Sequence, residues 1–345
     1  MSEQKTALVL GATGGIGGEV ARVLLARGWK VRALVRDAGK AVRRDGLQWV
    51  QGDAMSSRDV LDAARGAALI VHAVNPPGYR KWAQLVLPMI DNTIAAARVT
   101  GARIVLPGSI YNYGPDSWPD LREDSAQQPT TRKGRIRVEM EVRLRAAAQD
   151  RVQTLVVRAG DFFGPQAANN WFSQGLVKAG QPVKSISYPG KKGVGHQWTY
   201  LPDMAQTIVQ LAESESLPGG FTVFQMDGHW DDDGTRMTSA IRRAVSNAQG
   251  KAPDGKQSAR EPKVKAFPWW LVTVAAPFVT LFHEMKEMRY LWQQPIRMNN
   301  ARLVSVLGSE PHTPLDEAVR ATLEGQGCIE ALQTAAATRS TRMVA

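Results

Sequence analysis

The residues best suited to chemistry near the start of the chain are glycines. Gly11, Gly14 and Gly17 recur every three residues, between an apolar run at 6–10 and a pattern of helical spacing at 16–24. Glycines at such a junction allow the backbone to turn sharply and to approach a pyrophosphate, which then rests at the N-terminus of the helix. The pattern predicts a dinucleotide-binding loop. Its candidate residues are Gly11, Thr13, Gly14, Gly15, Ile16 and Gly17.

The ends of the next predicted strands supply candidates for the rest of the nucleotide. Arg36 follows the strand predicted at 30–35. An acidic residue at that place would bind the ribose 2′-hydroxyl, whereas an arginine suits a 2′-phosphate. We therefore expect NADP(H) in preference to NAD(H), which stays open as the alternative. Asp53, Ala73 and Asn75 follow the third and fourth predicted strands and are candidates for contacts with adenine, ribose and pyrophosphate.

Strand and helix patterns alternate through the first half of the chain. Repeated βα units require a parallel sheet with right-handed crossovers, and ligands bind at the carboxyl ends of its strands. The expected fold class is α/β, a Rossmann doubly wound parallel sheet with a smaller C-terminal substrate-binding lobe. The predicted strands are 6–10, 30–35, 47–50, 68–74, 103–106 and 152–157, and the predicted helices include 57–65, 80–100 and 134–148.

The 345 residues suffice for about two domains. We expect an NAD(P)-binding Rossmann domain at 1–165, with its core continuing to about residue 225. Glycine, proline and aromatic residues become frequent beyond 165, which predicts a mixed C-terminal lobe at 166–333, mainly helical after 263. The polar, alanine-rich stretch 334–345 is expected to be a tail.

The chain resembles the extended short-chain dehydrogenase/reductase family, in its NAD-dependent epimerase/dehydratase-like branch. The resemblance covers roughly residues 5–210. It implies that the N-terminal domain binds the cofactor, that the C-terminal lobe selects the substrate, and that two copies pair through the helices at 80–100 and 134–148. The matching motifs are the glycine triplet, Asp53, Ser109 with Tyr113-Gly114, Arg158-Ala-Gly-Asp-Phe-Phe-Gly-Pro165 and Thr199-Tyr-Leu-Pro-Asp-Met-Ala205.

The catalytic pair departs from that family. Its members use Ser or Thr together with Tyr-x-x-x-Lys on the helix after the fifth strand, where tyrosine exchanges the proton. Counting from Ser109 puts Lys133 at the tyrosine position and Arg137 at the lysine position. The chain is therefore identified as an atypical member, and its candidate catalytic residues are Ser109, Tyr113, Lys133 and Arg137.

The proton donor stays open between two side chains. Arg137 lies four residues after Lys133, on the same helix face, and a neighbouring cation would lower the pKa of the lysine. Tyr113, or Tyr111 beside it, could donate the proton instead. In the third reading, Tyr113 packs in the core and Lys133 is solvated.

Composition narrows the functional class. The net charge is +11 and there is one cysteine, Cys328, so one chain can form neither a disulfide nor a cysteine-based zinc site. No metal site and no nucleic-acid partner are expected. The start of the chain lacks the pattern of a signal peptide, and the lone cysteine fits a cytoplasmic location. The uncharged run 266–282 contains prolines and predicts no membrane span, although contact with a membrane surface stays open.

The leading hypothesis is an NADP-dependent oxidoreductase of the carbonyl reductase or dehydrogenase type, acting on a small molecule as a homodimer. A nucleotide-sugar epimerase or dehydratase is the second hypothesis, because the resemblance and the positive charge suit such substrates. A non-catalytic NADP-binding sensor is the third, because the Tyr-x-x-x-Lys pair is missing.

Overall fold

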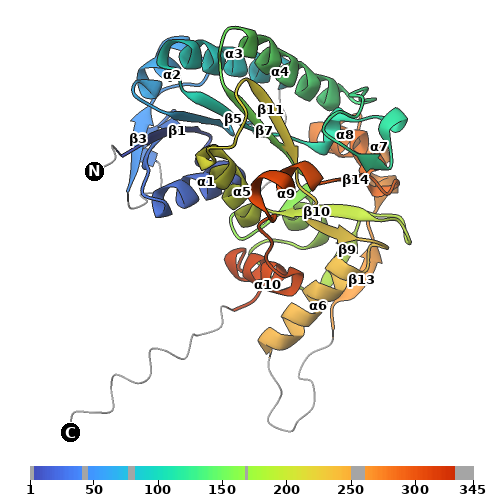
Figure 1. Ribbon diagram of the computed structural model, residues 1–345. Helices are drawn as coiled ribbons and strands as arrows, with labels where there is room; N and C mark the ends of the chain where they lie inside the picture. Colours follow the sequence, from blue (N-terminus) through green and yellow to red (C-terminus); the bar gives the residue numbers. More distant parts are fainter. Residues whose placement is uncertain (1–3, 41–45, 77–81, 168–169, 250–260, 331–345) are drawn as a thin grey trace, which may run out of the picture.

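The computed structural model describes residues 4–330 apart from 41–45, 77–81, 168–169 and 250–260. Seven parallel strands form its main sheet, in the order β11-β7-β5-β4-β1-β2-β3 (Figure 1). This order confirms the predicted doubly wound fold class. The predicted tail at 334–345 lies outside the described residues. The strands are β1 (Thr6–Leu10), β2 (Lys30–Val35), β3 (Leu47–Gln51), β4 (Leu69–His72), β5 (Arg103–Pro107), β7 (Thr154–Arg158) and β11 (Phe221–Gln225).

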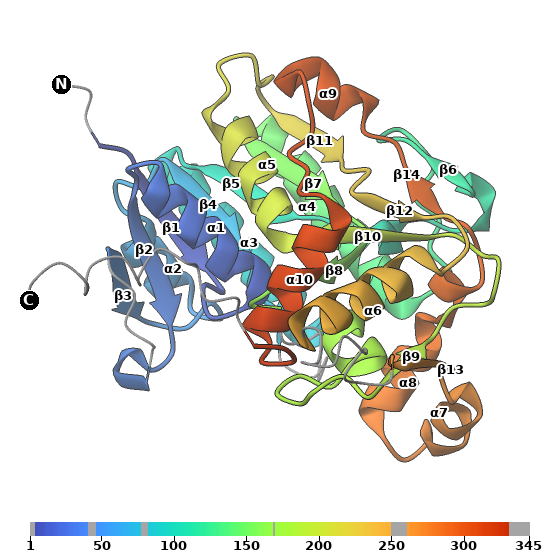
Figure 2. The same ribbon diagram turned by 90° about the horizontal axis from the view of Figure 1, so that it is seen from below.

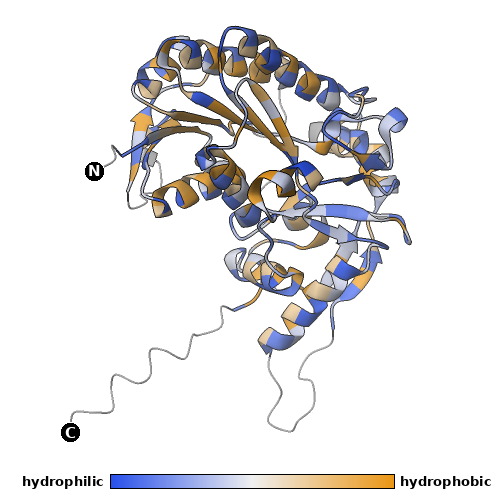
Figure 3. Ribbon diagram, in the orientation of Figure 1, coloured by the Kyte–Doolittle hydropathy of each residue, from blue (hydrophilic) through white to orange (hydrophobic). Residues whose placement is uncertain are grey.

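Helices cover both faces of the sheet, which makes three layers. α1 (Gly15–Ala26) and α5 (Leu201–Glu213) pack on one face, and α2 (Ser57–Ala64), α3 (Trp82–Thr100) and α4 (Arg132–Gln149) pack on the other (Figure 1). Successive strand residues point to opposite faces. The strands are apolar along most of their length (Figure 3), because both of their faces are buried.

The C-terminal lobe has its own small sheets and an aromatic core. Its three-stranded sheet joins β8 (Asp161–Phe163), β10 (His196–Tyr200) and β12 (His229–Asp231), and the chain returns to the main sheet between them through α5 and β11. Two strand pairs, β9 (Ser185–Tyr188) with β13 (Lys263–Ala266) and β6 (Asp120–Leu121) with β14 (Arg297–Met298), extend the lobe (Figure 2). The remaining elements are η1 (Ala38–Lys40), η3 (Ile110–Asn112), η4 (Pro115–Ser117), η5 (Phe172–Leu176), α6 (Arg236–Gln249), α7 (Trp269–Ala275), α8 (Thr280–Glu287), η6 (Arg289–Trp292), α9 (Ala301–Leu307) and α10 (Leu315–Gly325).

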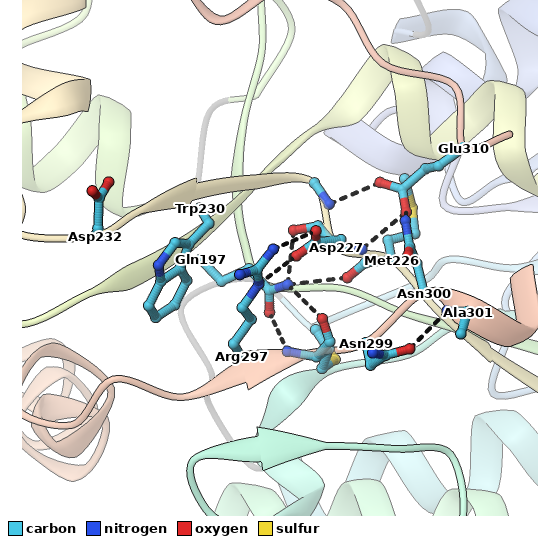
Figure 4. A network of polar contacts seen from close by, with 12 residues as sticks. Gln197, Met226, Asp227, Trp230, Asp232, Arg297, Asn299, Asn300, Ala301 and Glu310 are labelled. Carbon is cyan, nitrogen blue, oxygen red and sulfur yellow. Dashed lines mark hydrogen bonds and ion pairs between the residues drawn. The ribbon is translucent and has the colours of Figure 1, made fainter. Parts of the chain in front are cut away.

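A polar network joins β10 to the segments around it (Figure 4). The Gln197 side-chain amide donates to the carbonyls of Met226, Asp227 and Met298 at 3.2, 2.7 and 3.3 Å, and its carbonyl accepts from the Met298 amide at 3.0 Å. The Glu310 carboxylate accepts from the Asp227 and Gly228 amides at 2.9 and 2.8 Å. These bonds tie the end of the main sheet to the C-terminal segments.

Helices α7 and α8 form a hairpin that projects from one corner of the lobe, beside β9 and β13 (Figure 2). α8 reaches back to the N-terminus of α4, where the Glu287 carboxylate accepts from the Arg132 amide. In the part of the chain that the structure describes, no helix combines the length and the apolar character needed to cross a bilayer.

Candidate functional site

The predicted dinucleotide loop lies between β1 and α1 and has no room for side chains at two of its glycines. A Cβ atom on Gly11, whose φ is +91°, would come within 2.5 Å of the Ala73 carbonyl oxygen at the end of β4. A Cβ atom on Gly17 would come within 2.3 Å of the Gly11 carbonyl oxygen. The Gly14 amide donates to that same oxygen at 2.9 Å. The glycine spacing therefore follows from close backbone packing.

The N-terminus of α1 suits an anion. Gly14 is its N-cap residue and supplies no side-chain acceptor, and the first turn of α1 carries no acidic residue. Thr13 and Gly14 are exposed, while Gly15 and Ile16 are half-buried. The first amide groups of a helix point outward and carry partial positive charge. The residues present therefore fit the pyrophosphate of a dinucleotide.

The candidates for the adenosine end follow neighbouring strands. Arg36 is exposed directly after β2, and Asp53 is half-buried after β3. One Asp53 carboxylate oxygen accepts from the Met55 amide at 3.0 Å, and the Asp53 amide donates to Asp59 at 2.9 Å. Asp53 therefore shapes the turn that follows β3, and its second oxygen is the one suited to a ligand.

Asn75 and Arg137 meet the same indole. Trp82 donates from Nε1 to Asn75 Oδ1 at 2.5 Å, and the Arg137 guanidinium lies 5.3 Å from the centre of the Trp82 ring. Arg137 also donates to the Pro107 carbonyl at 3.4 Å. The ends of β4 and β5 and the predicted lysine-equivalent position thus come together at one edge of the sheet.

His72 is a neutral base buried at this edge. Its Nδ1 lies 2.8 Å from the Thr93 hydroxyl, which donates to the Met89 carbonyl at 3.1 Å. Nδ1 must then carry the proton, because the Thr93 hydroxyl has its own proton in use. Burial, with a smaller contribution from nearby Arg137, lowers the pKa of His72 to about 3. Arg137 is thus the only cation of this pair.

Ser109 and Tyr113 begin at the same strand end but differ in environment. Ser109 is half-buried, and its Oγ accepts from the Tyr111 amide at 3.1 Å. Tyr113 is buried, and its hydroxyl contacts Arg158, Gln225 and the Arg122 carbonyl. Burial raises the pKa of Tyr113 to about 12. The structure therefore places Ser109 at the strand edge and the Tyr113 hydroxyl inside the core.

The partner of Tyr113 belongs to a buried ion pair. Arg158 is fully buried and lies 2.5 Å from Glu141 on α4. Asn112 donates to the same carboxylate at 2.8 Å. Breaking such a pair leaves an uncompensated buried charge, so the network holds β7, α4 and the segment after β5 together. The Arg158 motif thus has a structural role in this chain.

Lys133 is buried rather than solvated, which is a correction to the third reading of the sequence. Its Nζ lies 2.9 Å from the Glu284 carboxylate and donates to the Glu284 carbonyl at 3.3 Å. Burial lowers the pKa of Lys133, while the hydrogen bond and charge of Glu284 raise it. Thr131 caps the helix by accepting from the Gly134 amide at 3.0 Å, which fixes Lys133 in the first turn of α4.

Sequence reasoning missed the α8 side of this site. Glu284 and Glu287 are one helical turn apart, and both contact the first turn of α4. Tyr290 follows them and stacks on Trp118 at 5.4 Å, and its buried hydroxyl has no hydrogen-bond partner within the described residues. The i, i+3 acidic pair was the available signal, but Glu284 lies 151 positions after Lys133, so the sequence did not reveal their contact.

His196 fills a neighbouring position in the lobe. Its Nε2 lies 3.0 Å from Asp161 and its Nδ1 lies 3.1 Å from the Leu291 carbonyl. The ring of His196 stacks on Trp292 at 3.7 Å. The cavity beside it measures about 10 Å³, room for one water molecule. No cluster of three His, Cys, Asp or Glu side chains suited to a metal occurs in the described ranges.

Comparison with known proteins settles the first half of the chain. Residues 11–158 match the family model described as NAD(P)H-binding. This part of the chain is similar to NAD(P)H-binding domains. The matched region contains the glycine loop, Arg36, Asp53 and the whole of α4.

Two curated relatives match parts of the chain. A 3-diazoavenalumate denitrifying reductase from a Streptomyces species is 33% identical over 175 residues, which are 46% of this chain and 56% of that protein. Sterol demethylase protein B from Methylococcus capsulatus is 42% identical over 69 residues, which are 19% of this chain and 21% of that protein. The chain thus spans about half of the first relative and a fifth of the second.

A solved structure matches nearly the whole chain. The UDP-glucuronic acid 4-epimerase from Bacillus cereus, in complex with NAD, has a TM-score of 0.70 and 15% identity, covering 94% of this chain and 99% of its own. At that identity the likeness shows the fold. This fold is the one that the resemblance to extended short-chain dehydrogenases implies.

Proposed function

We propose that the protein is an NADP(H)-dependent reductase of a small organic molecule, with Lys133 in the place of the usual catalytic tyrosine. The buried Lys133–Glu284 pair, 2.9 Å apart at the start of the helix that also carries Arg137, is the observation on which the proposal rests. A surface lysine would need no such partner, and burying an ammonium group is costly. The relative described as a reductase supports the reaction type.

The chain's own residues divide the work of binding. The amides at the start of α1 would hold the pyrophosphate, and Arg36 would bind a 2′-phosphate, which favours NADP(H) over NAD(H). Asp53, Ala73 and Asn75 would line the adenosine and ribose path. Arg137 would hold ribose or phosphate beside Trp82, because a guanidinium keeps its charge and exchanges no proton.

The proton would come from Lys133. When bound, the nicotinamide supplies a hydride, and reduction of a carbonyl then needs one proton on the oxygen. Ser109 Oγ would donate a hydrogen bond to that oxygen, and Lys133 Nζ would release the proton. Glu284 holds Nζ in place and stabilises the charged form from which the proton leaves.

The experiment is a hydride-transfer screen with NADPH deuterated at C4. A panel of carbonyl compounds tests the reductase, with product deuterium as the readout and an enzyme-free control. The panel also includes an aryl diazonium compound. Its reduction replaces N₂ by one hydride and, unlike carbonyl reduction, leaves no oxygen to protonate. Deuterium in a product supports the proposal, whereas tight NADPH binding without transfer to any compound would count against it.

The second candidate function is epimerisation or dehydration of a nucleotide sugar. The fold likeness to a UDP-glucuronic acid 4-epimerase favours it. We rank this function second because Lys133 stands at the position of the tyrosine that exchanges the proton in that family. NAD(H) retained through purification, together with a bound nucleotide sugar, would reverse the order. The sensor hypothesis requires that Lys133→Ala leave every function intact.

We further propose that two copies pair through the outer faces of α3 and α4. Val99 on α3 and Val142 on α4 are among the exposed large apolar side chains. A cytoplasmic location is also proposed, since the single cysteine, Cys328, is buried and free. Sedimentation velocity of the protein and of Val142→Asp tests the pairing, because a buried carboxylate would separate the copies.

A further inference from the structure

Most of the exposed large apolar side chains within the described residues lie in one stretch of the chain. Six of the nine found within the described residues lie between residues 264 and 279, on β13 and the α7–α8 hairpin. Trp270 is 71% exposed and Phe278 is 88% exposed. We call this group the hairpin patch. It consists of Val264, Trp270, Leu271, Val274, Phe278 and Val279.

The hairpin is anchored by its other face. Trp269 donates from Nε1 to the Pro189 carbonyl at 2.8 Å and packs against Phe267 and Trp171 at 5.0 and 5.7 Å. Val272, a residue of α7, is buried. The apolar residues that attach the hairpin are therefore distinct from those of the hairpin patch, which contribute little to holding the fold.

The surface of α7 offers almost nothing polar to water. The exposed Thr273 donates its hydroxyl to the Trp269 carbonyl at 2.8 Å, so its polar group is turned onto the backbone. No charged residue occurs from 266 to 282. Exposed apolar side chains gathered in this way mark a site of contact.

Four exposed lysines lie around the hairpin patch. Lys263 and Lys265 are exposed on β13, and Lys286 is exposed on α8. Lys184 is exposed next to Ser185, the register partner of Lys263. Among the nearby acids, Glu284 and Glu287 contact the start of α4, Asp232 pairs with Arg236, and Glu261 is exposed.

We propose that the hairpin patch docks on an anionic lipid bilayer surface. Trp270 and Phe278 would enter the boundary between headgroups and acyl chains, where aromatic side chains are favoured. The lysines would face the anionic headgroups. The hairpin would lie in the interface without crossing it, in keeping with the length of its two short helices.

The docked face adjoins the candidate site. The α8 helix that continues from the hairpin patch also carries Glu284 and Glu287, which contact Lys133 and its neighbour Arg132. Docking would bring this edge of the molecule to the bilayer, where amphipathic molecules concentrate. The docking proposal stands on the hairpin alone and does not depend on the proposed reductase activity.

The test is co-sedimentation with vesicles of phosphatidylcholine alone and of phosphatidylcholine with phosphatidylglycerol. The full-length protein is expected to bind the anionic vesicles, and Trp270→Ser/Phe278→Ser to bind them at least about tenfold more weakly. The matched control is Met55→Ser, which removes an exposed apolar side chain from the loop after β3 and should leave binding unchanged. Unchanged thermal melting confirms that each variant is folded.

A second set of variants tests whether docking requires the lysines. Lys263→Gln and Lys265→Gln should each weaken binding to the anionic vesicles about fivefold, while Lys30→Gln, an exposed lysine on β2, should not. Absence of vesicle binding by the unaltered protein would overturn the proposal. So would a dimer that Trp270→Ser/Phe278→Ser dissociates, because the hairpin patch would then join two copies of this chain.

Discussion

Lys133 is the residue on which the chemistry depends. Its position follows from the spacing after Ser109, which the sequence shows, but its environment does not. Glu284 lies 151 positions away along the chain, and only the folded α8 brings its carboxylate to 2.9 Å from Nζ. Burial and this carboxylate act on the pKa of Lys133 in opposite directions.

A pH profile tests this balance. The acid form of Lys133 must be present for a proton to leave, so the rate of reduction should fall as the pH rises through its pKa. Glu284→Gln removes the group that raises that pKa, so the fall should occur at lower pH. Lys133→Met should lower kcat/KM at least about a hundredfold with NADPH affinity unchanged. A Glu284→Gln profile identical to that of the unaltered protein would contradict the assignment.

Tyr113, the other candidate proton donor, has a structural environment instead. The sequence offered it as a proton donor, and the structure shows its hydroxyl in contact with Arg158 and Gln225. Tyr113→Phe should leave these donors unsatisfied and lower the free energy of unfolding by about 1–3 kcal/mol. We expect unchanged kcat in the folded variant. Urea unfolding and steady-state kinetics separate the two effects, and loss of kcat without loss of stability would return Tyr113 to a catalytic role.

Elements were predictable where the local pattern was strong. The predicted bounds of β1 and β2 agree with the structure, because β1 is an apolar run that ends at a glycine and β2 ends at the charged Arg36. The strand predicted at 68–74 is shorter, Leu69–His72, and α4 begins at Arg132 instead of Gly134, because Thr131 caps it. The sequence could not predict which face of the α7–α8 hairpin is exposed to solvent, because an uninterrupted apolar run does not show which of its side chains pack against the rest of the protein.

The loop between β1 and α1 gives a prediction for an element. Gly17→Ala should abolish NADPH binding, because its Cβ would meet the Gly11 carbonyl at 2.3 Å and displace the loop. Gly66→Ala is the matched control. Gly66 has a positive φ, +69°, but nothing lies within 4 Å of its Cβ position, so stability should fall by about 1 kcal/mol with binding unchanged. Equal NADPH affinity in both variants, measured by fluorescence titration, would contradict the proposal that this loop binds the dinucleotide.

At the scale of the molecule, a few polar side chains join the lobe to the sheet. Gln197 makes four hydrogen bonds to backbone groups of two segments, Met226–Asp227 and Met298 (Figure 4). Gln197→Leu should lower the free energy of unfolding by about 3 kcal/mol, since it strands buried backbone groups. Gln294→Leu, at an exposed position, should change it by less than about 0.5 kcal/mol. Similar unfolding midpoints in urea for the two variants would show that the network is dispensable.

The whole account rests on the nucleotide that the sheet edge and α1 receive. Calorimetric titration of the protein with NADPH and with NADH, beside Arg36→Ala, tests it most directly. We predict tight binding of NADPH, weaker binding of NADH, and loss of the NADPH preference in Arg36→Ala through removal of the 2′-phosphate contact. Binding of neither nucleotide, or equal affinity for both in the unaltered protein, would contradict the account.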